Sequence, residues 1–129
     1  MMKLLLDTHT FLWLDGSPER LSARALAACE DPNNHLYLSV VSAWEIQIKY
    51  QINRLKLEVS VQEMIQGQQD ANGLNILLVE LYHIYALQQL PLHHNDPFDR
   101  LLIAQANAEQ MRLVSADGRF EPYLVDVIW

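Results

Sequence analysis

Short apolar runs alternate with helix-forming segments along the chain. The apolar runs have the length of buried strands, and they predict strands at residues 3–6, 36–39, 75–79, 112–115 and 123–128. Helical spacing and helix-start residues predict helices at 8–14, 22–30, 40–52, 60–70, 81–90 and 96–109. Strands that alternate with helices in so short a chain imply an α/β fold, with a mainly parallel sheet covered on both faces. We expect one domain over residues 1–129.

The composition is that of a folded chain. Hydrophobic residues make up 50% of the sequence and charged residues 19%, so burial of apolar surface can offset the lost chain entropy. The single cysteine, Cys29, excludes an intrachain disulfide and is expected in the core. Asp7 ends the first leucine run, and the next apolar stretch, 36–44, is too short to span a bilayer. We therefore expect no membrane association and a cytoplasmic location.

The net charge of −7 argues against one class of function. A protein that coats nucleic acid with a broad basic surface needs the opposite balance, because Lys and Arg supply the affinity for phosphates. Excess acid usually forms only a solvated surface. It becomes informative where particular carboxylates lie in places that a surface would not explain.

Two aspartates follow predicted strands directly. Asp7 comes after 4–6 and Asp117 after 113–116. Open α/β sheets bind ligands outside the carboxyl ends of their strands, which makes both residues candidates for a site. Either one alone is explained equally well as a loop or N-cap aspartate, but two at equivalent positions favour a function.

A glutamate lies within the apolar stripe predicted for helix 40–52. The apolar residues of that stripe are Val41, Trp44, Ile48 and Ile52. Glu45 falls among them, where an unpaired carboxylate would cost several kcal/mol to bury. The alternative is an i,i+4 ion pair with Lys49 at the edge of the stripe.

Two more aspartates begin the helix at 96–109. Asp96 suits the N-cap, and Pro97 suits the first helical position. Asp99 can interact with the positive end of the helix dipole, which accounts for it about as well as a functional role does.

If these side chains converge at one strand end, they need a cation, because four clustered carboxylates repel one another strongly. The candidates are Asp7, Glu45, Asp99 and Asp117. All-oxygen ligands favour Mg²⁺ or Mn²⁺, and the chemistry that fits is metal-assisted phosphodiester hydrolysis. Four further residues could line the site or bond to its carboxylates, namely Thr8, His9, Ser42 and Ser115.

Other chemistry has weaker support. The adjacent His93 and His94 cannot face the same way on a regular element, which disfavours a zinc site. The chain has no glycine-rich phosphate loop, which disfavours ATP and NAD sites. We expect Trp13, Trp44 and Trp129 to pack in the core or an interface rather than to stack on bases.

Four segments together resemble the acidic motifs of PIN domains, specifically of VapC-type toxins. In chain order they are Leu5-Leu6-Asp7-Thr8-His9-Thr10-Phe11-Leu12-Trp13, Ser42-Ala43-Trp44-Glu45-Ile46, Asp96-Pro97-Phe98-Asp99-Arg100-Leu101-Leu102-Ile103-Ala104-Gln105-Ala106 and Ser115-Ala116-Asp117-Gly118-Arg119-Phe120. The resemblance covers essentially the whole chain.

The resemblance implies a three-layer α/β/α PIN fold and a Mg²⁺- or Mn²⁺-dependent endoribonuclease, the toxin of a type II toxin–antitoxin pair. It places the family's metal-binding acids on Asp7, Glu45, Asp99 and Asp117, and it prefers Asp99 to Asp96. It further implies a homodimer and a small VapB-like antitoxin whose tail covers the acidic groove. We expect the basic residues that contact RNA to be Lys49, Arg100 and Arg119.

Two alternatives stay open at this stage. One is a PIN-like binding module that uses the acidic groove only to hold a protein partner. The other is a phosphatase or phosphoryl-transfer domain with Asp7 as nucleophile. His9 stands where such an enzyme would carry its second acid, which disfavours this alternative.

Overall fold

A computed structural model describes all residues from Met1 to Trp129 and contains a five-stranded sheet. The strands are β1 (Lys3–Leu6), β2 (His35–Ser39), β3 (Asn75–Leu77), β4 (Arg112–Val114) and β5 (Val127–Ile128). Their order is β3-β2-β1-β4-β5, and every neighbouring pair is parallel. The parallel sheet predicted from the sequence is confirmed, with β1 at its centre.

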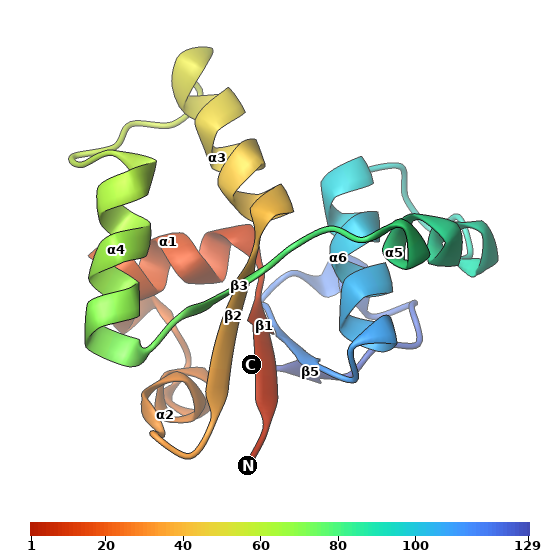
Figure 1. Cartoon of the computed structure of the whole chain (residues 1–129), viewed down its shortest axis with the longest axis horizontal. Helices are drawn as coiled ribbons and strands as arrows, with labels where there is room; N and C mark the ends of the chain where they lie inside the picture. Colours follow the sequence, from red (N-terminus) through yellow and green to blue (C-terminus); the bar gives the residue numbers. More distant parts are fainter.

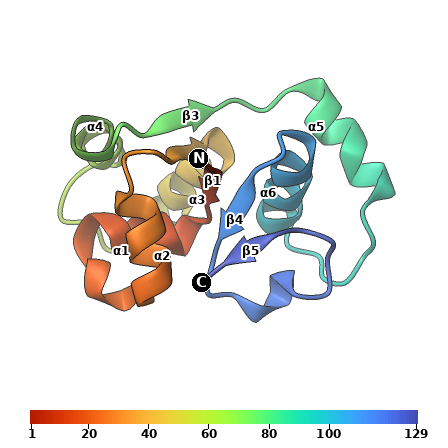
Figure 2. The same ribbon diagram turned by 90° about the horizontal axis from the view of Figure 1, so that it is seen from below.

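Helices cover both faces of this sheet. The α-helices are α1 (Thr8–Gly16), α2 (Ala23–Glu30), α3 (Val40–Gln51), α4 (Val61–Asn72), α5 (Leu81–Ala86) and α6 (Pro97–Ala108). Short 3-10 helices are η1 (Pro18–Arg20), η2 (Leu87–Gln89) and η3 (Gly118–Phe120). Helices α1, α2 and α4 lie on one side of the sheet, and α5 and α6 lie on the other (Figures 1 and 2).

The alternation of side chains along β1 divides the core into two layers. Leu4 and Leu6 point to one face, where they pack with residues of α1, α2 and α4. Leu5 points to the opposite face and packs with Leu102 and Ile103 of α6. The three-layer α/β/α arrangement predicted from the sequence is therefore confirmed.

Helix ends follow the capping residues that the sequence indicated. Ser60 caps α4, because its hydroxyl accepts from the N–H of Glu63. The same helix ends at Gly73, whose φ of 65° is the left-handed conformation that glycine adopts without strain. Asp96 caps α6 by accepting from the N–H groups of Phe98 and Asp99.

The strand predicted at 123–128 was wrong over most of its length, because only Val127–Ile128 pairs in the sheet. The preceding residues form turns in which Tyr123 N–H donates to Phe120 O and Val125 N–H donates to Tyr123 O. The Tyr123 side chain is buried, and its hydroxyl oxygen accepts from the backbone N–H groups of His93 and His94. Tyr123 therefore binds the loop that contains His93 and His94 and does not extend the sheet.

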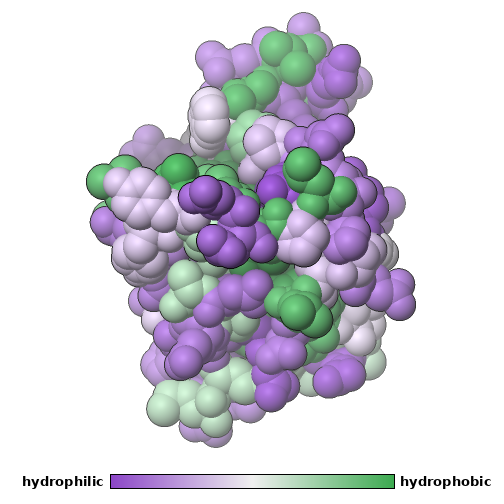
Figure 3. Space-filling model, turned by 90° about the vertical axis from the view of Figure 1, so that its right-hand side faces the viewer, coloured by the Kyte–Doolittle hydropathy of each residue, from purple (hydrophilic) through white to green (hydrophobic).

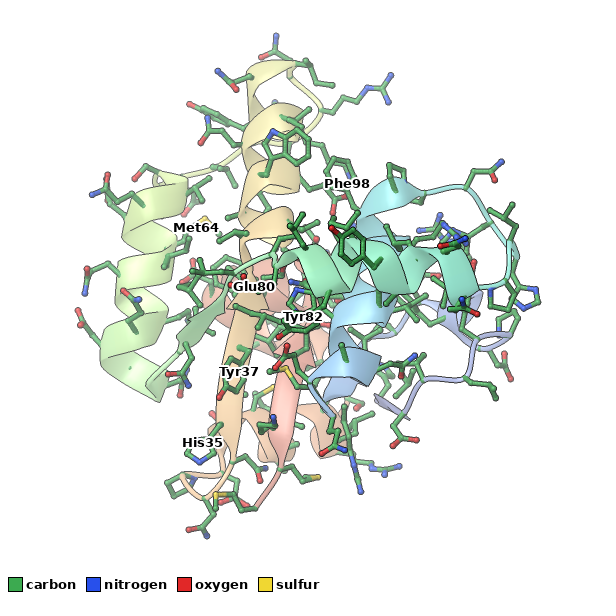
Figure 4. All side chains as sticks on the ribbon, turned by 45° about the vertical axis from the view of Figure 1, so that its right-hand side comes forward. His35, Tyr37, Met64, Glu80, Tyr82 and Phe98 are labelled. Carbon is green, nitrogen blue, oxygen red and sulfur yellow. The ribbon has the colours of Figure 1, made fainter.

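The predicted apolar stripe of α3 was wrong at Trp44 and Ile52, whereas Val41 is buried as predicted. The buried side chains of this helix are Val41, Ser42, Glu45 and Ile46. Trp44 is 62% exposed because it lies on the opposite face of α3 from the buried Glu45 and Ile46. Ile52, just after the helix, is 55% exposed, where the far end of α3 extends beyond the sheet (Figure 1). Trp44 packs edge-on against Phe98, with the ring centroids 5.4 Å apart, and Phe98 lies at the start of α6 (Figure 4).

The other tryptophans pack as predicted. Trp13 and Trp129 contact each other at 5.9 Å between ring centroids and pack against the core around β1. Cys29 belongs to the same core and is 3% exposed. No helix combines the length and hydrophobicity that a membrane span requires.

Helix α5 is fastened to α6 by a buried histidine. His83 is fully buried; its Nδ1 accepts from the Glu80 N–H at 2.9 Å, and its Nε2 lies 2.8 Å from Glu109 Oε2. The Tyr82 hydroxyl also bonds to Glu109 from the exposed side of α5 (Figure 4). Around this anchor, Leu81 and Tyr85 are exposed, and Figure 3 shows apolar side chains scattered among polar ones on this side of the molecule.

Candidate active site

The candidate site lies where the strand order reverses at the centre of the sheet. From β1 the chain leads to β2 on one side, whereas β4 pairs with β1 on the other side. Asp7 follows β1 and Asp117 follows β4, so both carboxylates lie at the carboxyl ends of adjacent strands. Ligands of open α/β sheets bind at such a switch point.

Asp7 is buried and held at both carboxylate oxygens. Its Oδ1 accepts from the Thr10 N–H at 2.8 Å, which caps α1, and its Oδ2 accepts from the Ser115 hydroxyl at 2.5 Å. Burial raises the pKa of Asp7 above its ordinary value, and the bonds from Ser115 and Thr10 oppose that increase. These contacts fix the orientation of the carboxylate. They also disfavour Asp7 as an attacking nucleophile, because each of its oxygens already accepts a hydrogen bond.

Glu45 projects from α3 toward the start of α1. Its Oε1 accepts from the Thr8 hydroxyl at 2.7 Å, and its Oε2 lies 2.6 Å from Lys49 Nζ. The Thr8 and Ser42 hydroxyl oxygens are 3.1 Å apart, which extends the contact back to α3. The alternative suggested by the sequence, an i,i+4 pair with Lys49, is thus present. It accounts for one oxygen of Glu45, while the other faces Thr8, next to Asp7.

Asp99 lies on the first turn of α6 and is 14% exposed at its side chain. Burial raises its pKa to about 7, and the nearby charges of Asp96, Glu45 and Asp117 act in the same direction, while Arg119 opposes them. Glu45 and Asp117 are thus close enough to affect the ionisation of Asp99. The helix-cap role belongs to Asp96, which leaves the carboxylate of Asp99 free to face the site.

Asp117 is held by an arginine two residues along the chain. Arg119 Nε lies 3.2 and 3.0 Å from the two oxygens of Asp117, and Arg119 Nη2 lies 2.7 Å from Asp117 Oδ2. The same Nη2 lies 3.1 Å from Asp99 Oδ2. Arg119 lowers the pKa of Asp117, and the two carboxylates raise the pKa of Arg119.

The four predicted acids converge on one edge of the sheet but do not form a compact ligand set. No group of three or more His, Cys, Asp or Glu side chains is close enough to hold one metal ion. The Arg119 guanidinium lies between Asp99 and Asp117, at hydrogen-bond distance from both. The donor set still fits a hard cation, since it consists of carboxylates with hydroxyl groups nearby.

Several neighbours proposed from the sequence do contact the acids. Ser115 bonds to Asp7, and Thr8 bonds to Glu45 and approaches Ser42. His9 is exposed, and its charge lowers the pKa values of both Asp7 and Asp117, so it lies at the rim of the site.

Each basic residue expected to contact RNA has a partner within the chain. Lys49 pairs with Glu45, and Arg119 bridges Asp99 and Asp117. Arg100 donates to the backbone oxygens of Pro91 and Leu90 at 2.8 and 3.3 Å, which fastens that loop to α6. Their contact with RNA stays a prediction.

A buried contact between β2 and α6 was not predicted from the sequence. The Ser39 hydroxyl donates to Gln105 Oε1 at 2.6 Å, and both side chains are fully buried. Gln105 Nε2 in turn donates to Leu78 O at 3.3 Å. This contact joins the end of β2 to α6, the helix that carries Asp99. A glutamine in an otherwise apolar helix stretch was the only hint of it.

Comparison with known proteins finds one similar sequence and several solved structures with the same fold. Ribonuclease VapC22 of Mycobacterium tuberculosis is 28% identical over 126 residues, which cover 95% of this chain and 93% of that protein. The VapBC2 structure of Rickettsia felis, bound to a DNA fragment from its promoter, matches with a TM-score of 0.72 at 18% identity, over 98% of both chains.

Two further structures share the fold. DNA-bound VapBC of Salmonella typhimurium matches with a TM-score of 0.64 at 14% identity, over 99% of this chain and 98% of that one. FitAcB of Neisseria gonorrhoeae matches with a TM-score of 0.61 at 17% identity, over 98% and 96%.

The family itself is established by a match that spans nearly the whole chain. The PIN domain family matches residues 4–123, a range that includes all four candidate acids, strands β2 to β4 and all of β1 except Lys3. The resemblance predicted from the four acidic motifs is thereby confirmed, and the chain is a member of the PIN domain family.

Proposed function

We propose that this chain is a divalent-metal-dependent endoribonuclease and the toxin component of a toxin–antitoxin pair. The observation that carries the proposal is the convergence of four carboxylates from four separate segments at the switch point of the sheet. Asp7, Glu45, Asp99 and Asp117 come from the end of β1, from α3, from α6 and from the loop after β4. A merely solvated acidic surface does not explain burial of Asp7 and Glu45 at this point.

The relatives support the same proposal. The similar protein of Mycobacterium tuberculosis is named a ribonuclease, and similar folds occur in VapBC and FitAcB assemblies. We extend both features to this chain, namely an RNA substrate and a small VapB-like antitoxin as partner. A homodimer and a cytoplasmic location belong to the same proposal.

The acids have distinct tasks in the proposed reaction. A bound Mg²⁺ or Mn²⁺ supplies a water of lowered pKa and stabilises negative charge on the phosphate. Asp99 and Asp117 would hold the ion, with Glu45 beside them. Asp7 is oriented by Ser115 and Thr10, and Glu45 is oriented by Thr8, so neither carboxylate has to be ordered when the ion arrives. His9 lies at the rim, where the RNA backbone would approach Asp7 and Asp117.

Cleavage of a panel of single-stranded and structured RNAs tests the proposal. The purified protein, freed of any bound antitoxin, is assayed with Mg²⁺, Mn²⁺ or EDTA. We expect cleavage with either metal and none with EDTA. Asp99→Asn should reduce the rate by at least about 100-fold, the scale of losing one electrostatic group in an active site.

Asp126→Asn is the matched control for this experiment. It removes the same charge from an exposed aspartate just before β5, at the opposite end of the strands from Asp117. The control should cleave at the wild-type rate. Equal cleavage by wild type and Asp99→Asn would contradict the proposed site, and cleavage that EDTA leaves unchanged would contradict the metal dependence.

A non-catalytic binding module is the second candidate function. The observation in its favour is that Lys49 and Arg119 already pair with three of the four acidic side chains from within the chain. Such a module would bind its protein partner equally well with and without divalent cations. Failure to cleave any RNA, together with partner binding that EDTA does not change, would favour this function.

A further inference from the structure

Arg119 takes the position between two of the four acids. Its Nη2 atom lies 3.1 Å from Asp99 Oδ2 and 2.7 Å from Asp117 Oδ2. These two carboxylates come from α6 and from the loop after β4, and one nitrogen contacts both. A cation shared by Asp99 and Asp117 would have to lie at this same point.

A guanidinium and a divalent ion cannot both occupy that position. The N–H···O contacts keep the carboxylate oxygens about 3 Å from the nitrogen, whereas Mg²⁺ binds oxygen at about 2.0 to 2.1 Å. The two occupants therefore hold the acids at different separations.

The remaining acids are also satisfied without a metal. Lys49 Nζ lies 2.6 Å from Glu45, and Asp7 accepts bonds from the Ser115 hydroxyl and the Thr10 N–H. Lys49 and Arg119 together carry two positive charges, the same charge as one divalent ion. They offset part of the negative charge of the metal-free site, which reduces the repulsion among its carboxylates.

The Arg119 side chain can also move away from the two carboxylates. Its side chain is 56% exposed, more than either Asp99 or Asp117. Arg119 lies in η3, a single short turn. At Gly118, the residue before it, there is open space where a side chain would be. The guanidinium can therefore rotate into solvent without disturbing the core.

We propose that Arg119 is an internal counter-cation that competes with the divalent ion for Asp99 and Asp117, so that it lowers the affinity of the site for metal. This inference rests on the proposed function, since it concerns the same acidic site. Arg119 stabilises the metal-free protein, and each metal ion that binds has to displace it. The protein is then active only when the divalent cation is abundant enough to displace Arg119 from Asp99 and Asp117.

Calorimetric titration of the metal-free full chain with MnCl₂ tests the inference. The variants are wild type, Arg119→Gln, Arg119→Lys and the control Arg112→Gln. Arg112 is exposed and begins β4, at the opposite end of that strand from the site. We expect Arg119→Gln to bind Mn²⁺ about 5- to 50-fold more tightly than wild type, a typical range for coupled binding. Arg119→Lys should fall between them, and Arg112→Gln should match wild type.

Thermal unfolding supplies a second measurement that does not depend on activity. In EDTA, Arg119→Gln should unfold at a lower temperature than wild type, because its carboxylates lose their counter-charge. With saturating Mn²⁺, the gain in unfolding temperature should be larger for Arg119→Gln than for wild type. Circular dichroism checks that all variants are folded.

The outcomes separate this inference from the proposed function. Equal Mn²⁺ affinity of wild type and Arg119→Gln overturns the role of Arg119 and leaves the metal-dependent nuclease intact. Absence of Mn²⁺ binding in both proteins overturns the inference and the metal dependence together. Binding by Arg119→Gln that is tighter than in wild type, or seen in the variant alone, supports the inference.

Discussion

The hydroxyl of Ser115 joins Asp7 to the loop that carries Asp117. Ser115 Oγ donates to Asp7 Oδ2 at 2.5 Å and accepts from the Asp117 N–H at 3.0 Å. One buried atom thus fixes the orientation of a carboxylate at the end of β1 and the path of the chain after β4. The two central strands of the sheet are linked at the point where the candidate site lies.

Replacing Ser115 by alanine should therefore impair both stability and cleavage. Loss of a buried hydrogen bond to a charged group typically costs about 1 to 3 kcal/mol, which urea unfolding measures. The pKa of Asp7 should rise further, because Ser115 is the strongest influence that lowers it. Ser17→Ala, at a partly exposed residue after α1, is the control and should change neither property. Unchanged stability of Ser115→Ala would show that this bond contributes little.

The pKa of Asp99 predicts a pH-dependent stability of the metal-free protein. The value is raised from 3.8 to about 7 in the folded state, mainly by burial. The folded state therefore binds the proton more tightly than the unfolded state, and stability falls as pH rises from about 4 to 7. The change from this group is at most about 4 kcal/mol, since one pKa unit corresponds to about 1.4 kcal/mol.

Asp99→Asn should remove this dependence. In EDTA, the variant should be more stable than wild type at pH 8, and the difference should shrink as pH falls toward 5. Urea unfolding at pH 5, 6, 7 and 8 measures it, with Asp126→Asn as the exposed control that should follow wild type. A constant difference across this range would mean that Asp99 has its ordinary pKa.

His83 should be needed to hold α5 against α6. His83→Ala would leave a cavity and remove the acceptor for the Glu80 N–H and the contact to Glu109. We expect a loss of about 2 to 4 kcal/mol in the free energy of unfolding, typical of a large buried side chain. His35→Ala, at an exposed residue of β2, should cost much less. Equal losses in the two variants would contradict the anchoring role.

Cys29 should resist thiol reagents in the folded protein. Its side chain is buried in the core, and burial raises the pKa of its thiol to about 11. At pH 8 only about one thiol in a thousand is then ionised, and the thiolate is the reactive form. Ellman's reagent should react slowly in buffer and promptly in urea. Prompt reaction in buffer would show that the helix carrying Cys29 opens readily.

Features that depend on near neighbours in the chain could be predicted from the sequence. Alternating strand and helix patterns are local, so they predicted the parallel sheet and its two helical layers. Capping is also local, which is why Ser60 and Asp96 were identified correctly. The positions of Asp7 and Asp117 followed from the strand ends, because parallel strands place their carboxyl ends at one edge.

Other features were decided by the tertiary structure alone. Trp44 is exposed because α3 packs with the face that carries Val41, Ser42, Glu45 and Ile46, and the apolar periodicity of the sequence did not identify that face. Tyr123 leaves the predicted strand because its hydroxyl bonds to a loop 30 residues away.

The contacts within the candidate site also depend on tertiary structure. Arg119 reaches Asp99 across 20 residues, and Ser39 reaches Gln105 across 66. Such pairs form only when the sheet brings distant segments together, since a charge or hydroxyl in the sequence has many candidate partners. The sequence therefore identified which acids to examine, and the packing of β1, β4 and α6 decided which cation lies between two of them.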